Sequence, residues 1–61
     1  MDAYFFDEES GDAIMSTKAD PGLSIGESWD GPDGKARIVV KVEYNPLHQM
    51  VFYYVRLKNS K

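Results

Sequence analysis

Apolar and polar positions alternate most clearly between residues 36 and 57. The segment ARIVVKVEY (36–44) is apolar at every second position, which is the period of a half-buried strand. The segment NPLH (45–48) follows, with Asn and Pro at the first two positions of a type I turn. The return segment QMVFYYVRLK (49–58) is a strand with apolar groups on both sides, because Met50 to Val55 are all apolar. The pattern therefore predicts two antiparallel strands joined by a tight turn.

Turn length and pattern together predict one alignment of these strands. A four-residue turn pairs Tyr44 with Gln49, and apolar residues then face each other along one side of the hairpin. The predicted pairs on that side are Val42 with Val51, Val40 with Tyr53, Ile38 with Val55, and Ala36 with Leu57. We expect this side of the hairpin to be buried.

The same alignment predicts which residues lie on the second side. The expected pairs there are Glu43 with Met50, Lys41 with Phe52, Val39 with Tyr54, and Arg37 with Arg56. In a small antiparallel sheet the second side is usually polar, because it faces water. A stripe made of Val39, Met50, Phe52 and Tyr54 is too apolar for that position and requires an explanation.

Arg37 opposite Arg56 would be a like-charge pair, which destabilises a sheet. An acidic side chain between the two guanidinium groups would remove the repulsion. The candidates are Glu8, Glu9, Asp12 and Glu27. Otherwise the pair would suit an anion, such as a phosphate or the carboxylate of a partner.

The first 35 residues predict a second hairpin and an irregular connection. AYFF (3–6) and DAIMST (12–17) are short strands around a polar turn, with Phe6 opposite Ala13 and Tyr4 opposite Met15. Pro21-Gly22 and DGPDG (30–34) are turn signals. Between them, LSIGESW (23–29) is expected to form one short strand that points Leu23 and Ile25 inward. Trp29 is expected to fold over the core, and the acidic residues of the turns are interpreted as solvated.

These elements predict a single all-β domain over residues 1–61. We expect a small antiparallel sheet of four to five short strands, built as two hairpins joined by an irregular loop. An SH3-like barrel is the architecture that fits this order of elements best. No motif in the chain is specific enough to indicate a family, and a fold of this kind would not determine the function.

A chain of 61 residues buries only about 60% of its unfolded surface, so it is marginally stable by itself. The chain has no cysteine and one histidine, His48, so disulfides and an ordinary zinc site are excluded. Self-association is the stabilising device that remains. The charge is uneven, because residues 1–34 hold nine acids and one lysine whereas residues 35–61 hold six bases and one acid. Such asymmetry either pairs within the fold or marks an interaction surface.

Several classes of protein are disfavoured by the sequence. No segment reaches membrane-spanning length or resembles a secretion signal, so the cytoplasm is the expected location. His48 lies in a turn, no serine has a histidine nearby in sequence, and no glycine-rich phosphate loop is present. We therefore expect no enzymatic activity, no cofactor and no metal site. Met1 favours a complete chain.

Three interpretations of the stripe are possible. In the first, the sheet curls so that the stripe is covered by other parts of the chain. In the second, the stripe contacts a second copy or another protein, because aromatic and Met side chains near arginine are typical of interfaces. The residues of that contact would be Val39, Met50, Phe52, Tyr54 and Arg56, with Trp29 as a further anchor.

In the third interpretation Phe52 and Tyr54 stack on the bases of a single-stranded nucleic acid. Nucleic-acid phosphates or other anions would then be bound by Arg37, Lys41, Arg56 and Lys58. The net charge of −3 argues against this interpretation, because nucleic-acid-binding domains are usually basic. The sequence favours a small non-catalytic accessory module that acts through protein–protein contact, with another protein or a second copy of itself as the partner.

Overall fold

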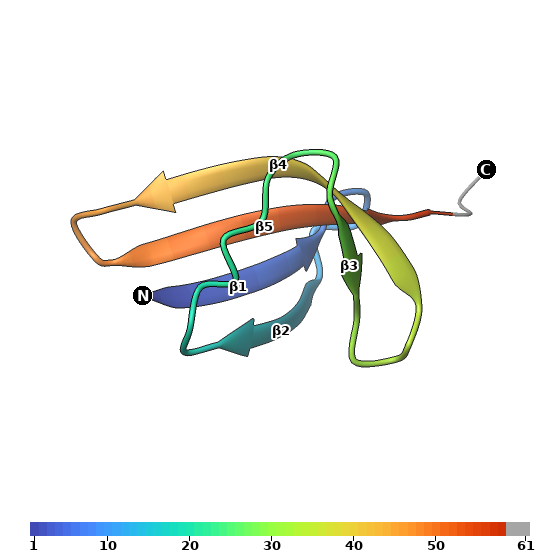
Figure 1. Cartoon of the computed structure of the whole chain (residues 1–61), viewed down its shortest axis with the longest axis horizontal. Helices are drawn as coiled ribbons and strands as arrows, with labels where there is room; N and C mark the ends of the chain where they lie inside the picture. Colours follow the sequence, from blue (N-terminus) through green and yellow to red (C-terminus); the bar gives the residue numbers. More distant parts are fainter. Residues whose placement is uncertain (59–61) are drawn as a thin grey trace.

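The computed structural model describes residues 1–58 of the chain as one five-stranded sheet (Figure 1). The strands are β1 (Asp2–Asp7), β2 (Ala13–Thr17), β3 (Ser28–Asp30), β4 (Ala36–Asn45) and β5 (Met50–Leu57). Their order across the sheet is β2-β1-β5-β4-β3. The sheet curls into a half-barrel, and the described residues contain no helix, as expected for an all-β chain. Accordingly, no helix in residues 1–58 is long and apolar enough to cross a membrane.

The sheet is mixed, which corrects the prediction of a purely antiparallel sheet. β1 pairs with β5 in parallel over six residues, from Asp2 opposite Met50 to Asp7 opposite Val55. The other three pairings are antiparallel. The parallel pair arises because the chain leaves β2, crosses the sheet, and returns through the β3–β4 and β4–β5 connections on the far side (Figure 1). The first and last strands therefore lie side by side in the middle of the sheet.

The core lies on one face of this sheet, which we call the covered face. It is formed by Ala3, Phe5, Val39, Val51, Tyr53 and Val55, each at most 2% exposed. Phe5 stacks between two aromatic rings, with centroid distances of 4.0 Å to Trp29 and 5.1 Å to Tyr53. The expectation that Trp29 closes over the core is therefore confirmed.

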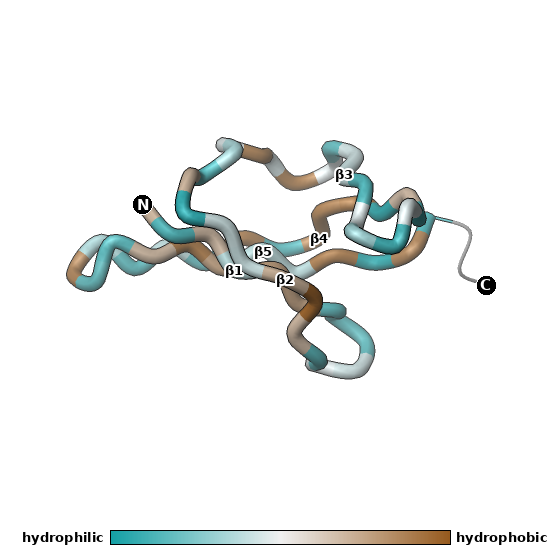
Figure 2. The backbone as a smooth tube through the Cα atoms, turned by 90° about the horizontal axis from the view of Figure 1, so that it is seen from below, coloured by the Kyte–Doolittle hydropathy of each residue, from teal (hydrophilic) through white to brown (hydrophobic). Residues whose placement is uncertain are grey.

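Residues 18–27 cross the covered face and complete the cover (Figure 2). The phenol oxygen of Tyr53 holds this crossing segment, since it accepts a hydrogen bond from Leu23 N at 3.1 Å and donates one to Asp20 Oδ1. Leu23 packs against the core, as predicted, but Ile25 is 66% exposed, so its predicted inward position is wrong. The predicted strand over 23–29 is also too long, because only Ser28–Asp30 pairs with β4 as a strand.

The β4–β5 hairpin is present, but its predicted alignment is wrong. The turn still has four residues but lies one residue later than expected, with Asn45 opposite Met50, and Gln49 adopts a left-handed conformation (φ 52°) within it. Val42 and Tyr44 still face Tyr53 and Val51, so the two sides of the hairpin are correct near the turn.

A bulge between Val39 and Lys41 then reverses the sides over the first half of β4. Val39 lies opposite Val55 and is completely buried, whereas it was predicted to lie on the second side. Ile38 lies opposite Arg56 on the second side, whereas it was predicted to face Val55 in the core. One extra residue in β4 therefore moves every side chain between Ala36 and Val39 to the other face.

The β1–β2 hairpin shows the same kind of irregularity. Phe6 lies opposite Ala13, as predicted, but a shift between Phe5 and Phe6 pairs Tyr4 with Ser16 rather than with Met15. The acidic turn closes through Asp7, whose carboxylate accepts hydrogen bonds from the backbone and hydroxyl of Ser10. This turn bends away from the crossing segment, to the opposite side of the sheet (Figure 2).

Candidate protein-interaction face

The second side of the sheet, which we call the open face, carries a group of partly buried aromatic side chains. These are Tyr4 and Phe6 from β1 and Phe52 and Tyr54 from β5. They share one side because the parallel pairing sets Tyr4 opposite Phe52 and Phe6 opposite Tyr54. The alternate residues of the same two strands form the core.

The four rings contact one another in a continuous cluster. The ring centroids of Tyr4 and Phe52 are 5.6 Å apart, those of Phe6 and Phe52 are 5.8 Å apart, and those of Phe6 and Tyr54 are 5.6 Å apart. These distances lie in the range of favourable aromatic pairs. Phe52 contacts two rings and lies on the central strand, so it is the middle of the cluster. Met50 extends the apolar surface along β5, and Ile38 extends it on β4.

One ion pair borders the cluster on β4. Lys41 Nζ lies 3.4 Å from Glu43 Oε2 and 5.3 Å from the centroid of the Tyr54 ring. The Tyr54 hydroxyl donates a hydrogen bond of 3.0 Å to Glu43 Oε1. Partial burial, together with this bond to a carboxylate, raises the pKa of Tyr54 above its ordinary value, so the phenol is neutral at physiological pH.

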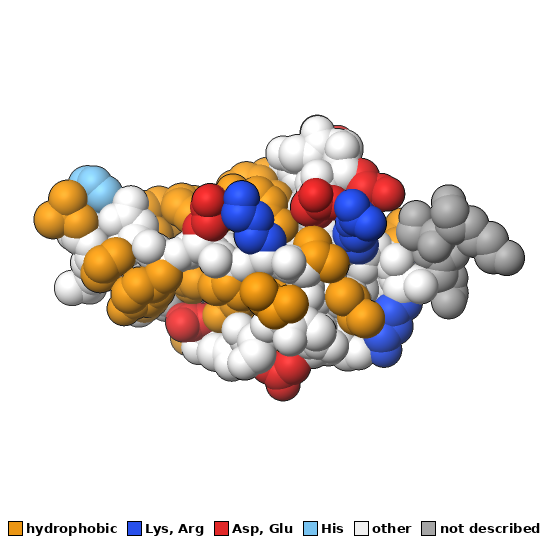
Figure 3. Space-filling view, turned by 90° about the horizontal axis from the view of Figure 1, so that it is seen from above, with side chains coloured by type: hydrophobic (Ala, Val, Ile, Leu, Met, Phe, Trp, Pro, Cys, Tyr) orange, Lys and Arg blue, Asp and Glu red, His pale blue; other side chains and the backbone are white. Residues whose placement is uncertain are grey.

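A second ion pair borders the cluster near the β1–β2 turn. Arg56 Nε donates a hydrogen bond of 2.7 Å to Glu8 Oε1. Glu8 was one of the acids predicted to neutralise an arginine here, and this contact confirms that it reaches Arg56. The hydrogen bond to Glu8 raises the pKa of Arg56 above its ordinary value. Figure 3 shows red and blue side chains meeting on this side of the molecule, with hydrophobic surface between and behind them.

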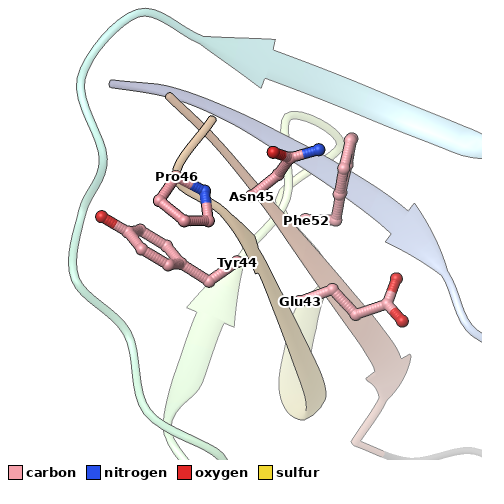
Figure 4. A pocket seen from close by; sticks show the side chains of 5 residues that line it. All are labelled: Glu43, Tyr44, Asn45, Pro46 and Phe52. Carbon is pink, nitrogen blue, oxygen red and sulfur yellow. The ribbon is translucent and has the colours of Figure 1, made fainter. Parts of the chain in front are cut away.

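A shallow hollow of about 360 Å³ lies at the turn end of the β4–β5 hairpin (Figure 4). It is lined by Glu43, Tyr44, Asn45, Pro46 and Phe52. The Tyr44 ring points away from Phe52 and Glu43 in this view, so the residues do not enclose a cavity. The hollow contains one carboxylate and no basic side chain. It has no arrangement of catalytic groups.

Two residues expected at the contact lie elsewhere. Val39 is 0% exposed in the core, so its side chain cannot reach a partner without unfolding β4. Trp29 lies on the covered face, stacked on Phe5 with an interplanar angle of 3°. Of the predicted contact residues, the structure brings Met50, Phe52, Tyr54 and Arg56 together on the open face.

Arg37 does not face Arg56, so the predicted arginine pair is absent. Arg37 lies opposite Leu57 and forms a two-pronged contact with Asp33, with Nη1–Oδ1 at 2.9 Å and Nη2–Oδ2 at 3.0 Å. This contact holds the pKa of Asp33 well below its usual range and raises that of Arg37. Gly31 leaves room beside it, because a Cβ at that position would overlap Nη1 of Arg37 and the guanidinium would have to move.

The basic residues of the predicted anion site are therefore dispersed. Arg37 is only 9% exposed and is occupied by Asp33, whereas Lys41 and Arg56 are on the open face and are paired with Glu43 and Glu8. Lys58 follows the end of β5, where its backbone N–H bonds to Ala36. Within residues 1–58 no group of three or more His, Cys, Asp and Glu side chains is arranged to hold a metal ion.

Sequence reasoning missed Tyr4 and Phe6 as members of the aromatic cluster. AYFF contains apolar residues at four consecutive positions, which indicates a strand with apolar groups on both sides. That signal places rings on two faces of β1, but it does not indicate that β1 lies next to β5. The cluster requires that long-range parallel pairing.

Comparisons with protein-family models, with curated proteins and with solved structures found no match for this chain.

Proposed function

We propose that this protein is a small non-catalytic binding module that contacts another protein through its open face. The observation that carries the proposal is the continuous cluster of Tyr4, Phe6, Phe52 and Tyr54 on the side of the sheet opposite the core. Rings of this kind, with Met50 and Arg56 beside them, have the composition that is enriched in protein interfaces.

The pairing of the nearby charges also favours a protein partner. Lys41 and Arg56 each have a carboxylate within 3.4 Å, so neither is available to bind a phosphate without first breaking an ion pair. The alternative function, binding of single-stranded nucleic acid or another anion, would need these side chains together with Arg37 and Lys58. Nucleic-acid binding would weaken steeply as salt is added, whereas contact through apolar rings would not.

Photo-cross-linking tests the proposal. A benzophenone amino acid replaces Phe52 in the middle of the cluster, and a matched chain carries it at Leu47, which is 85% exposed in the β4–β5 turn. In extract of the cells that produce the protein, we expect protease-sensitive adducts of discrete mass from position 52 and not from position 47. Absence of such adducts, or adducts that disappear after nuclease treatment, would refute the proposal.

We also propose an architecture and a location for the protein. The proposed architecture is SH3-like, which the small size and curl of the sheet support. The parallel β1–β5 pair differs from the purely antiparallel sheet that we predicted. The cytoplasm is the proposed location, supported by the lack of cysteine in the sequence. Imaging of the tagged chain in intact cells tests the location.

A further inference from the structure

The two faces of the sheet are covered unequally. Residues 18–27 and Trp29 cover one face, whereas on the other face the β1–β2 turn projects only beside the aromatic cluster, where Glu8 bonds to Arg56. Small domains bury the apolar face of a sheet against a second layer, which is either helix or sheet. The open face therefore lacks a layer that the described part of the chain does not supply.

The charge of the open face restricts the chemistry of that layer. Its two basic groups, Lys41 and Arg56, are each paired with an acidic group, Glu43 and Glu8. A strongly acidic or basic partner would gain little from such a border, because attraction to one pair member is offset by repulsion from the other. A second copy of this chain carries the same ion pairs, so the cations of one copy can face the carboxylates of the other.

The area of the face is compatible with a second copy. The four strands from β2 to β4 span roughly 19 Å at a strand spacing of about 4.8 Å, and β5 is about 26 Å long at 3.3 Å per residue. Two such faces bury on the order of 1,000 Å² in total, near the lower bound for a specific interface. The exposed surface of the described chain is 4125 Å², so the contact would use about an eighth of it. An interface of this size predicts a dimer that dissociates on dilution.

We propose that the open faces of two copies of this chain pack against each other across a two-fold axis, forming a two-layer β-sandwich. This inference rests on the proposed function and names the partner of the same face. Two sheets in such a sandwich lie about 10 Å apart. Phe52 is in the middle of the cluster and on the central strand, so the two Phe52 rings lie close to the axis. Met50, Ile38 and the ion pairs form the surroundings of this contact.

Sedimentation equilibrium of the purified 61-residue chain over a hundredfold range of concentration tests the proposal. We expect the wild-type mass to rise from that of one chain to that of two. Phe52→Lys places two like charges near the axis and is expected to weaken the dimer at least about thirtyfold, the effect of losing a central interface residue. Leu47→Lys is the matched control, because its side chain is exposed outside the face, and it should dimerise like the wild type.

A second variant avoids the aromatic cluster in case Phe52→Lys does not fold. Lys41 is 59% exposed, so Lys41→Glu leaves the core intact while making the border of the face acidic. We expect dimerisation at low salt to weaken about threefold or more, and added salt to restore it, because border charges are screened. The fluorescence of Trp29, on the covered face, reports whether each variant remains folded.

The results separate this inference from the proposed function. A wild-type chain that stays monomeric at every concentration overturns the inference, and adducts of a different protein at position 52 would leave the proposed function in place. If neither a dimer nor cross-linked adducts were found, both the inference and the proposed function would be overturned. A dimer that survives both Phe52→Lys and Lys41→Glu in folded chains would show that the copies meet through another surface, which also overturns the inference.

Discussion

The covered and open faces of this sheet are built from similar residues but differ in what lies over them. β5 contributes Val51, Tyr53 and Val55 to the covered face and Phe52 and Tyr54 to the open face. Both faces hold aromatic clusters with centroid distances below 6 Å. The covered side chains are almost fully buried because residues 18–27 and Trp29 lie over them. Hydrophobic character alone therefore does not identify the core of a small sheet, because the core is the face over which another segment of the chain lies.

The two adjacent tyrosines of β5 show the same contrast in their hydroxyl groups. The Tyr53 hydroxyl lies under the crossing segment and bonds to Leu23 and Asp20, whose positions are about thirty residues earlier in the chain. The Tyr54 hydroxyl bonds to Glu43 on the neighbouring strand, in contact with water. One hydroxyl therefore connects distant segments, whereas the other joins two side chains of one hairpin.

Adjacent residues of β4 give the strongest test of the two faces. Val39→Lys buries an unpaired charge and should cost about 5 kcal/mol, which is comparable to the whole stability expected for a chain of this length, roughly 3–9 kcal/mol. Ile38→Lys places the same charge on the open face and should cost about 1 kcal/mol. Circular dichroism with urea titration measures both. If the Val39→Lys variant folded and the Ile38→Lys variant did not, the alignment predicted from the sequence would be correct and the observed bulge would be wrong.

Adjacent aromatic residues of β1 give the next largest difference. Phe5→Ala removes a ring stacked between Trp29 and Tyr53 and should cost about 3–5 kcal/mol. Phe6→Ala removes a partly buried ring from the open face and should cost about 1–2 kcal/mol in the monomer, because less apolar area is lost from burial. Urea unfolding at a concentration below the dimer range measures the difference. Equal losses would mean that the open face is as well covered as the core.

The adjacent tyrosines of β5 should differ by a smaller amount. Tyr53→Phe removes the hydroxyl that accepts the hydrogen bond of Leu23 N, and it should lower the free energy of unfolding by about 1–2 kcal/mol. Tyr54→Phe removes an exposed hydroxyl and should change stability by no more than about 0.5 kcal/mol. Hydrogen exchange of the Leu23 amide should accelerate in Tyr53→Phe alone. Protection of that amide at the wild-type level would show that apolar packing, and not the hydroxyl, holds the segment.

The smallest expected effect concerns acid and the contact between Asp33 and Arg37. The pKa of Asp33 is lowered in the folded chain, so its stabilising contribution is complete above its unfolded value of about 4 and is lost as the pH falls through the lower folded value. Asp33→Asn should therefore lower the urea midpoint slightly at pH 7, and the difference should narrow as the solution is acidified below pH 4. Asp30→Asn, at an exposed residue in the same turn region, is the control. If the difference in urea midpoint between the wild type and Asp33→Asn widened in acid, the stabilising contact of ionised Asp33 with Arg37 would be contradicted.

The sequence was sufficient for the local elements and insufficient for their arrangement. Alternation and turn residues predict both hairpins, and the prediction of Trp29 over the core holds because no other large ring lies in the irregular region. The alignment of β4 was not predictable, because neither a left-handed Gln49 nor a bulge after Val39 has a local signal as strong as Asn-Gly or Gly.

The candidate face was predictable in part for the same reason. Phe52 and Tyr54 share a face with each other in any alignment, since the period of a strand keeps residues 52 and 54 together. The predicted position of Val39 depended on the alignment of the two strands of the hairpin, and it was therefore wrong. Tyr4 and Phe6 depended on a pairing between residues nearly fifty positions apart, for which pattern and turn chemistry provide no information.

The central place of β5 has a consequence for how the chain is made. During synthesis the β1–β2 hairpin and the β3–β4 hairpin emerge first, but they have no shared neighbour until Met50–Leu57 leaves the ribosome. The two hairpins therefore cannot join until β5 is present. Contacts of such long sequence separation slow this step of folding. A purified chain that ends at residue 49 should therefore remain sensitive to protease, whereas a chain that includes β5 should be protected.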